Sequence, residues 1–145
     1  MYISFSKVSL WIIKVLDIEG VGEEYAKNSM TLVFLLPRNI FSKTATPALR
    51  KKLAEETKIS PKLILKFANH ADLIRINGIG PQYAEILERA GVDTVNELKN
   101  RVPANLAKKV VEINEEKHLA KRSPTLKDVE KWVEEAKTLK PALTY

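Results

Sequence analysis

A glycine-containing segment that occurs twice constrains the fold of this chain most strongly. Residues 18–26 and residues 76–84 both contain an isoleucine, two glycines that flank one apolar residue, a tyrosine and an alanine. Glycine adopts positive φ angles and lets another backbone or a ligand approach closely. Each segment therefore predicts a tight turn followed by a helix, whose unpaired N–H groups and positive dipole end face the turn. The repetition indicates that one structural unit is used twice.

Helix-start patterns after the turns predict a mainly helical fold. Pro47, Pro61, Pro81 and Pro103 stand at positions typical of the first residue of a helix. Thr125, with an aspartate three residues later, resembles a capping box that opens the last helix. No segment of the second half has the pattern of a strand. We expect an all-α tandem repeat in one compact domain.

Large aromatic residues stand at corresponding positions of the two repeats. Phe67 and Trp132 both lie on apolar stripes with helical spacing, so we expect them to be buried anchors of the core. Tyr25 and Tyr83 also correspond, and we expect their rings to pack while their hydroxyl groups reach the surface. These aromatic residues are therefore interpreted as structural.

The repeat also predicts the domain organisation. We expect a first, divergent unit over residues 1–58 and a second unit over residues 59–145, packed together as one body. The pattern is lost at residues 29–37, where an apolar run replaces the glycine and capping threonine that follow the second turn. A short β-strand or an irregular segment within residues 1–40 would account for that loss.

Composition excludes several kinds of site. The chain has no cysteine and two histidines, so thiolate metal sites are excluded and a typical histidine metal site is not expected. No nucleophile is paired with a base, and no lysine follows the glycines as in a phosphate loop. We therefore expect no enzyme activity, cofactor, metal ion or small-molecule substrate.

The apolar N-terminal run does not predict a membrane segment. Residues 8–13 are mostly apolar, but Lys14 interrupts a run that is far too short to cross a bilayer. No small-residue cleavage site marks a secretory signal. We expect an intracellular, cytoplasmic protein that does not contact a membrane.

Positive charge is concentrated between the two turns. The formal net charge is +6, and residues 43–66 carry seven basic and two acidic side chains. Residues 67–96, which contain the second turn, carry two basic and four acidic side chains. The candidate basic face comprises Arg50, Lys51, Lys52, Lys62, Lys66, Lys108 and Lys109. Such a cluster is typical of a nucleic-acid contact or of a solvated helix face. Lys117, Lys121 and Arg122 follow a predicted helix, whose dipole they could complement.

The second turn and its flanks resemble the helix-hairpin-helix motif. The matching positions are Leu73, Ile76, Gly78, Ile79, Gly80, Ala84 and Leu87. With residues 90–98 included, the pattern is similar to the N-terminal domain of archaeal and eukaryotic RecA-type recombinases. Residues 15–140 as a whole resemble a family of tandem helix-hairpin-helix proteins catalogued as a domain of unknown function. The resemblance implies a small helical module that binds DNA or packs against a DNA-handling protein.

In the helix-hairpin-helix superfamily, backbone N–H groups of the hairpin hold a DNA phosphate without reading sequence. The resemblance assigns this role to Gly78, Ile79, Gly80, Pro81 and Gln82. The corresponding turn of the first unit consists of Gly20, Val21 and Gly22. Glu23 and Glu24 would repel a phosphate there, so we expect that first turn to be structural. The alternative for the second turn is also structural, with its N–H groups satisfied inside the protein.

Two functions remain open. The first is a non-catalytic, sequence-independent module for duplex DNA, which uses the hairpin amides and the basic face. The second is a protein–protein interaction or scaffold module that keeps the fold without binding nucleic acid. The net charge of +6 favours DNA, whereas the acidic residues near both turns favour the scaffold.

Overall fold

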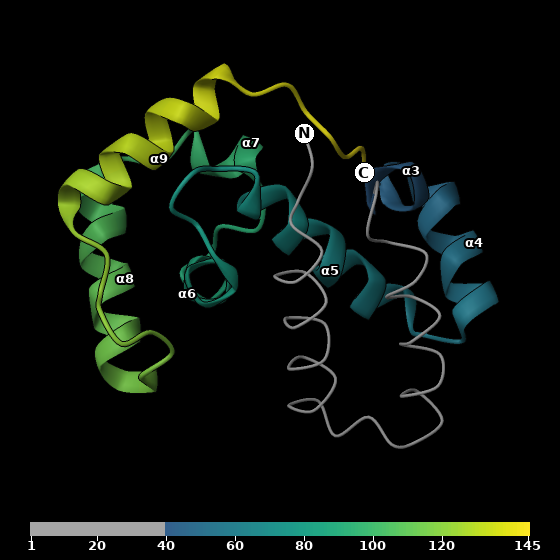
Figure 1. Ribbon diagram of the computed structural model, residues 1–145, viewed down its shortest axis with the longest axis horizontal. Coiled ribbons are helices and arrows are strands. Elements are labelled where there is room, and N and C mark those ends of the chain that lie inside the picture. The colour runs from purple at the N-terminus through teal and green to yellow at the C-terminus, as the bar shows by residue number, and fades with distance from the viewer. Residues whose placement is uncertain (1–39) are drawn as a thin grey trace. The chain divides into compact units, whose positions relative to one another are not determined.

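The computed structural model describes residues 40–145, which form seven helices and no strand within that range (Figure 1). The helices are α3 (Ile40–Thr44), α4 (Pro47–Thr57), α5 (Pro61–Ile74), α6 (Pro81–Arg89), α7 (Val95–Leu98), α8 (Pro103–Lys117) and α9 (Leu126–Thr138). The prediction of a mainly helical fold is confirmed. The turn at residues 20–22 and the strand expected within residues 1–40 precede the described residues, so the tandem repeat stays a prediction.

Side-chain caps and prolines explain where the helices begin. Thr46 accepts a hydrogen bond from the Leu49 N–H at 3.2 Å, and Pro47 takes the first position of α4. In the capping box of α9, the Asp128 N–H donates to Thr125 Oγ1 at 3.2 Å and the Thr125 N–H donates to the Asp128 carboxylate at 2.9 Å. These contacts satisfy N–H groups that have no partner inside the helix. The predicted starts of α4 and α9 are therefore confirmed.

The chain divides into two compact units at a point inside α5. The first unit ends at Ala71 and includes the C-terminal segment Ala142–Tyr145. The second unit comprises Asp72–Pro141. This division is one of compactness; the boundary between two repeat units, expected between residues 58 and 59, stays a prediction.

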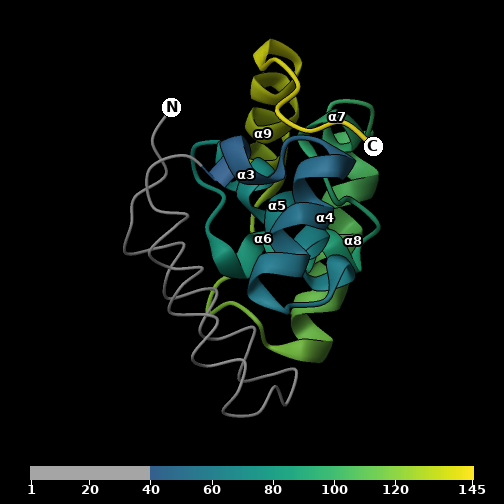
Figure 2. The ribbon, with the colours of Figure 1, turned by 90° about the vertical axis from the view of Figure 1, so that its right-hand side faces the viewer.

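Arg50 connects the C-terminal segment to the rest of the first unit. Helices α3 and α4 of this unit face the viewer in Figure 2. Its guanidinium donates to the Thr44 carbonyl at 2.8 Å and to the Thr144 carbonyl at 2.7 Å, and it lies 5.4 Å from the centre of the Tyr145 ring. Arg50 is 7% exposed. The sequence-based assignment of Arg50 to an exposed basic face is therefore corrected, because its charge is used inside the first unit.

The buried residues that the structure describes in both units are mainly apolar. Phe67 is 1% exposed among the buried residues of the first unit, and Trp132 is 3% exposed in the second. The core of the second unit includes Leu73, Ile76, Leu87, Leu106, Val110 and Val133. In that unit α8 and α9 lie side by side (Figure 1). The prediction that both large aromatic residues are buried is confirmed.

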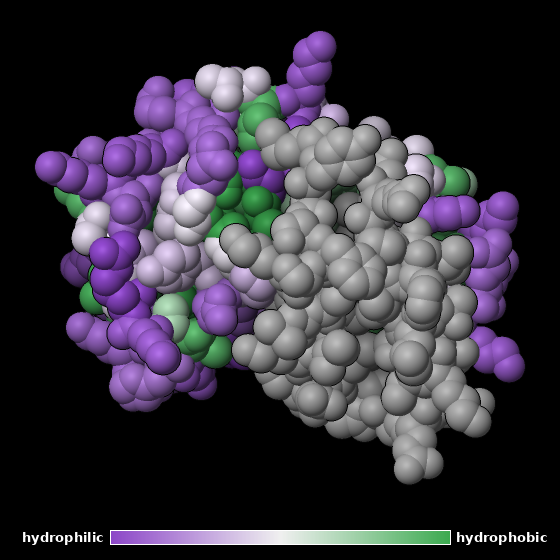
Figure 3. All heavy atoms as spheres, viewed as in Figure 1, coloured by the Kyte–Doolittle hydropathy of each residue, from purple (hydrophilic) through white to green (hydrophobic). Residues whose placement is uncertain are grey.

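The face shown in Figure 3 is largely polar where the structure describes it. Hydrophilic side chains cover most of the described surface that faces the viewer in Figure 3. Within residues 40–145, no helix combines the length and the apolar character needed to cross a bilayer.

Candidate functional site

The turn between α5 and α6 needs a glycine at position 78. Gly78 has φ +91°, a conformation that side-chain-bearing residues rarely adopt. A Cβ atom placed on it would lie 3.0 Å from Nε1 of Trp132 in α9. The Ile79 N–H donates to the Ile76 carbonyl at 3.2 Å and closes the turn. Gly78 is therefore explained by backbone geometry and by packing.

Gly80 has no such structural explanation. Its φ of −99° and ψ of −174° are extended values that any residue adopts. A Cβ atom on Gly80 would have its nearest neighbour, Oε1 of Gln82, at 3.8 Å, an ordinary contact distance. Gly80 is the N-cap of α6 and provides no side-chain hydrogen bond to the helix. Glycine is a favourable N-cap residue by type, but neither the backbone angles nor the packing at position 80 excludes a side chain, and its absence leaves the start of α6 uncovered.

Several backbone N–H groups at the start of α6 have no acceptor within residues 40–145. Among the hydrogen bonds of residues 40–145, none is donated by the N–H of Gly80, Gln82 or Tyr83, whereas the Ala84 N–H donates to the Gly80 carbonyl at 2.9 Å. Pro81 has no N–H. Free N–H groups and the positive dipole end together favour an anion at a helix start. The start of α6 can therefore accept an anionic ligand.

The preceding residue shows the opposite behaviour. The backbone N–H of Asn77 donates to the Glu135 carboxylate at 3.1 Å, and the Asn77 side-chain amide donates to the same carboxylate at 3.2 Å. One part of the turn is thus fixed to α9 by hydrogen bonds at the protein surface. The structural alternative that we considered from the sequence applies to the N–H groups of Asn77 and Ile79, which have acceptors, but not to those of Gly80 and Gln82, which have none among residues 40–145.

A groove separates the start of α6 from the loop between α8 and α9. It has a volume of about 780 Å³ and lies within the second unit. One wall consists of Gly78, Gly80, Gln82 and Tyr83. The facing wall consists of His118, Leu119, Ala120, Lys121 and Arg122. The unpaired amides therefore share the groove with cationic side chains.

Asn114 fixes the conformation of the α8–α9 loop. Its side chain is buried; Oδ1 accepts the Ala120 N–H at 2.9 Å, and Nδ2 donates to the Ala120 carbonyl at 3.1 Å and to the Ser123 hydroxyl at 2.9 Å. From the facing wall, the Tyr83 hydroxyl donates to the Arg122 carbonyl at 2.9 Å. The hydrogen bond from Tyr83 thus joins the two walls of the groove directly.

The Tyr83 ring completes the support below the turn. Its centroid lies 5.4 Å from that of the Trp132 ring, with the two planes tilted by 49°. Tilted aromatic pairs at this distance are favourable beyond the area they bury. The prediction that the Tyr83 ring packs while its hydroxyl group remains near the surface is confirmed.

The comparisons with known proteins place the chain in one family. Residues 37–139 match the family model described as Domain of unknown function (DUF4332). The chain belongs to this family. The matched range contains both walls of the groove. No curated protein and no solved structure matches the chain.

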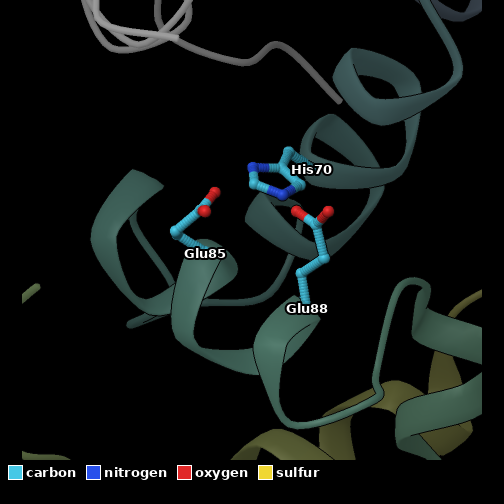
Figure 4. Close-up of side chains that lie close together, drawn as sticks. All are labelled: His70, Glu85 and Glu88. Atoms are coloured by element: carbon cyan, nitrogen blue, oxygen red, sulfur yellow. The ribbon is translucent and has the colours of Figure 1, made fainter. Parts of the chain in front are cut away.

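The acidic residues of α6 in this DUF4332 chain follow the first turn of the helix. The first turn of α6 contains no acidic residue. Glu85 and Glu88 follow later on the same helix, and Figure 4 shows both of them together with His70 of α5. Arg89 Nε lies 3.3 Å from the Glu85 carboxylate. Asp72 is buried, pairs with Arg75 at 2.7 Å and is not exposed at the turn. The net negative charge of residues 67–96 therefore does not oppose an anion at the turn.

The residues of the predicted basic face are divided between the two units. Lys51, Lys52 and Lys62 are exposed and Lys66 is partly exposed in the first unit, while Lys108 and Lys109 are exposed on α8 in the second. The cations that line the groove are instead Lys121 and Arg122, which sequence reasoning had assigned to the dipole of the preceding helix. No local pattern could have revealed them, because the fold brings their loop to the turn.

Proposed function

We propose that this chain is a non-catalytic accessory module that binds duplex DNA without sequence specificity. In the helix-hairpin-helix turn expected at residues 78–82, the open backbone N–H groups of Gly80 and Gln82, with that of Tyr83, would hold a phosphate of the DNA backbone. The observation that carries the proposal is the start of α6, where the N–H groups of Gly80, Gln82 and Tyr83 have no acceptor among the described residues. A phosphate carries the charge and the acceptor oxygens that this site requires.

The geometry at Gly80 supports this use of the turn. An alanine would fit at position 80, yet the residue is glycine. A missing side chain gives a bulky phosphate direct access to the backbone. Because phosphates are the same in every base pair, contact through these amides would position the protein without reading sequence.

Exposed lysines of both units support a nucleic-acid partner. They include Lys51, Lys52 and Lys62 of the first unit and Lys108 and Lys109 of the second. Lysines that neutralise phosphates release counterions and strengthen binding to any duplex. With the net charge of +6, these side chains would add a sequence-independent contribution to affinity.

Replacing Gly80 with serine tests the proposal at the amides themselves. Serine is a preferred N-cap residue, and its hydroxyl would accept the Gln82 or Tyr83 N–H that the phosphate needs. We expect Gly80→Ser to weaken binding to a fluorescent duplex in a polarisation assay. Stability should rise by about a few tenths of a kcal/mol, because serine caps a helix slightly better than glycine. Weaker binding by a more stable protein cannot result from damage to the fold.

The proposal fails if Gly80→Ser binds duplex DNA as tightly as the wild type. Gly80→Ala provides a control for size, since its Cβ fits but supplies no acceptor. We expect Gly80→Ala to bind more weakly than the wild type, because it hinders the approach of the phosphate. It should bind more tightly than Gly80→Ser, because its amides stay free.

A protein–protein interaction or scaffold role is the second candidate. The contacts of Asn77 with Glu135 and of Gly78 with Trp132 favour it, because they give part of the turn a purely structural purpose. In that case the folded wild type would show no binding to duplex DNA at low salt.

A further inference from the structure

The geometry points to the groove between residues 78–83 and residues 118–122 as a single two-walled site for the phosphodiester backbone. Lys121 and Arg122 are its cationic ligands, and Asn114 is a positioning residue that holds them. This inference rests on the proposed function and names the side chains that complete its site. It also assigns the main cationic contact beside the turn to Lys121 and Arg122 instead of the basic face expected from the sequence.

The volume of the groove is large enough for a phosphate-sized group. Its volume of about 780 Å³ falls within the ~300–1,000 Å³ of typical ligand pockets. One wall contains residues whose N–H groups have no acceptor among residues 40–145, and the other contains Lys121 and Arg122, so residues of both walls carry donor groups. A phosphodiester has only acceptor oxygens on its charged group and can use both walls at once.

The charged groups at the groove are available to a ligand. No ion pair among residues 40–145 involves Lys121, which is exposed. The Arg122 guanidinium lies 3.5 Å from the Asp128 carboxylate, but its side chain is 74% exposed, so this pair contributes little. Asp128 is also held by the Thr125 N–H, whose hydrogen bond is the largest cause of its lowered pKa. Arg122 can therefore turn to a phosphate while Asp128 keeps its own partner.

The loop is ordered before any ligand arrives. Asn114 makes three hydrogen bonds to Ala120 and Ser123, and Tyr83 bonds the Arg122 carbonyl from the facing wall. His118 takes a left-handed conformation with φ 51°, and its N–H donates to the Asn114 carbonyl at 2.8 Å. Ordering a loop during binding costs free energy, so a loop already ordered favours affinity. Asn114 thus acts through the cations and not by contact with DNA.

A paired charge removal tests the inference. Lys121→Gln/Arg122→Gln removes two positive charges from the groove. Lys137→Gln/Lys140→Gln removes two exposed charges from the same unit that do not line it. We would measure duplex affinity by polarisation over a range of salt concentrations, with unfolding monitored by circular dichroism. The groove variant should lower the magnitude of the salt slope by about 2 units, one for each lost phosphate contact. The control should keep the wild-type slope.

The outcomes separate this inference from the proposed function. Equal slopes for the two double variants would overturn the groove while leaving duplex binding in place. A wild type that does not bind duplex DNA would overturn both. Preferential binding of an acidic peptide over duplex DNA would also overturn the choice of phosphodiester.

Combining the substitutions tests whether the walls share one ligand. If one phosphodiester contacts both walls, adding Gly80→Ser to the groove variant Lys121→Gln/Arg122→Gln should reduce affinity by a smaller factor than the same change does in the wild type. If the combined loss of affinity equals the product of the two separate losses, the two walls make independent contacts, which would contradict a single site.

Asn114→Asp should lower affinity through the loop, and the effect should vanish in the Lys121→Gln/Arg122→Gln background. An undiminished effect in that background would remove the positioning role.

Discussion

Substituting each glycine of the turn with alanine gives the most direct test of the structural argument. The two sites lie two residues apart, but they differ in what they require. Gly78 has a positive φ, and forcing an L-residue into a left-handed conformation costs about 1–2 kcal/mol. Its Cβ would also lie 3.0 Å from Trp132 Nε1, and such overpacking typically costs about 1–3 kcal/mol. We therefore expect Gly78→Ala to lower the free energy of unfolding by roughly 2–5 kcal/mol.

Gly80→Ala should behave differently because its backbone is extended and its Cβ meets no atom closer than 3.8 Å. Removing glycine from the unfolded chain stabilises by about 0.4–1 kcal/mol, and the poorer N-cap preference of alanine opposes that gain. We expect a net change within about 1 kcal/mol of zero. Urea unfolding of both variants, followed by circular dichroism, measures the difference. Equal destabilisation by the two substitutions would refute the distinction between a structural Gly78 and a free Gly80.

Two further predictions concern the second unit. Trp132→Ala should cost about 3–5 kcal/mol, because it removes a buried ring that supports both Gly78 and Tyr83; a loss well below 1 kcal/mol would show that the ring is not part of the core. The lowered pKa of Asp128 stabilises the folded state above its unfolded pKa of about 3.9, and this contribution is lost as the pH falls through the lower folded value. Asp128→Asn should therefore reduce the loss of stability measured in acid, and an unchanged pH profile would contradict the role of the capping box.

The sequence predicts local structure well where the causes are local. Pro47 and Thr125 mark the starts of α4 and α9 because their side chains act within one turn of their own helix. Phe67 and Trp132 are predictable as buried residues because helical spacing alone separates an apolar stripe from a polar one.

Interactions between distant residues could not be predicted in this way. Arg50 is a typical surface residue by type, and its burial depends on a carbonyl of Thr144 at the other end of the chain. Lys121 and Arg122 reach the turn because Asn114 and Tyr83 hold their loop beside it. Helix α5 runs through the division between the units without interruption, so no break in its pattern marks that point.

The salt dependence of duplex binding by the wild type tests the central claim most directly. Binding should be measured with duplexes of unrelated sequence over a range of salt concentrations. The account predicts the same affinity for each duplex and a steep linear fall of log K with log salt concentration, because the contacts are to phosphates. Absence of binding by the folded protein at low salt, or affinity that depends strongly on sequence, would contradict it.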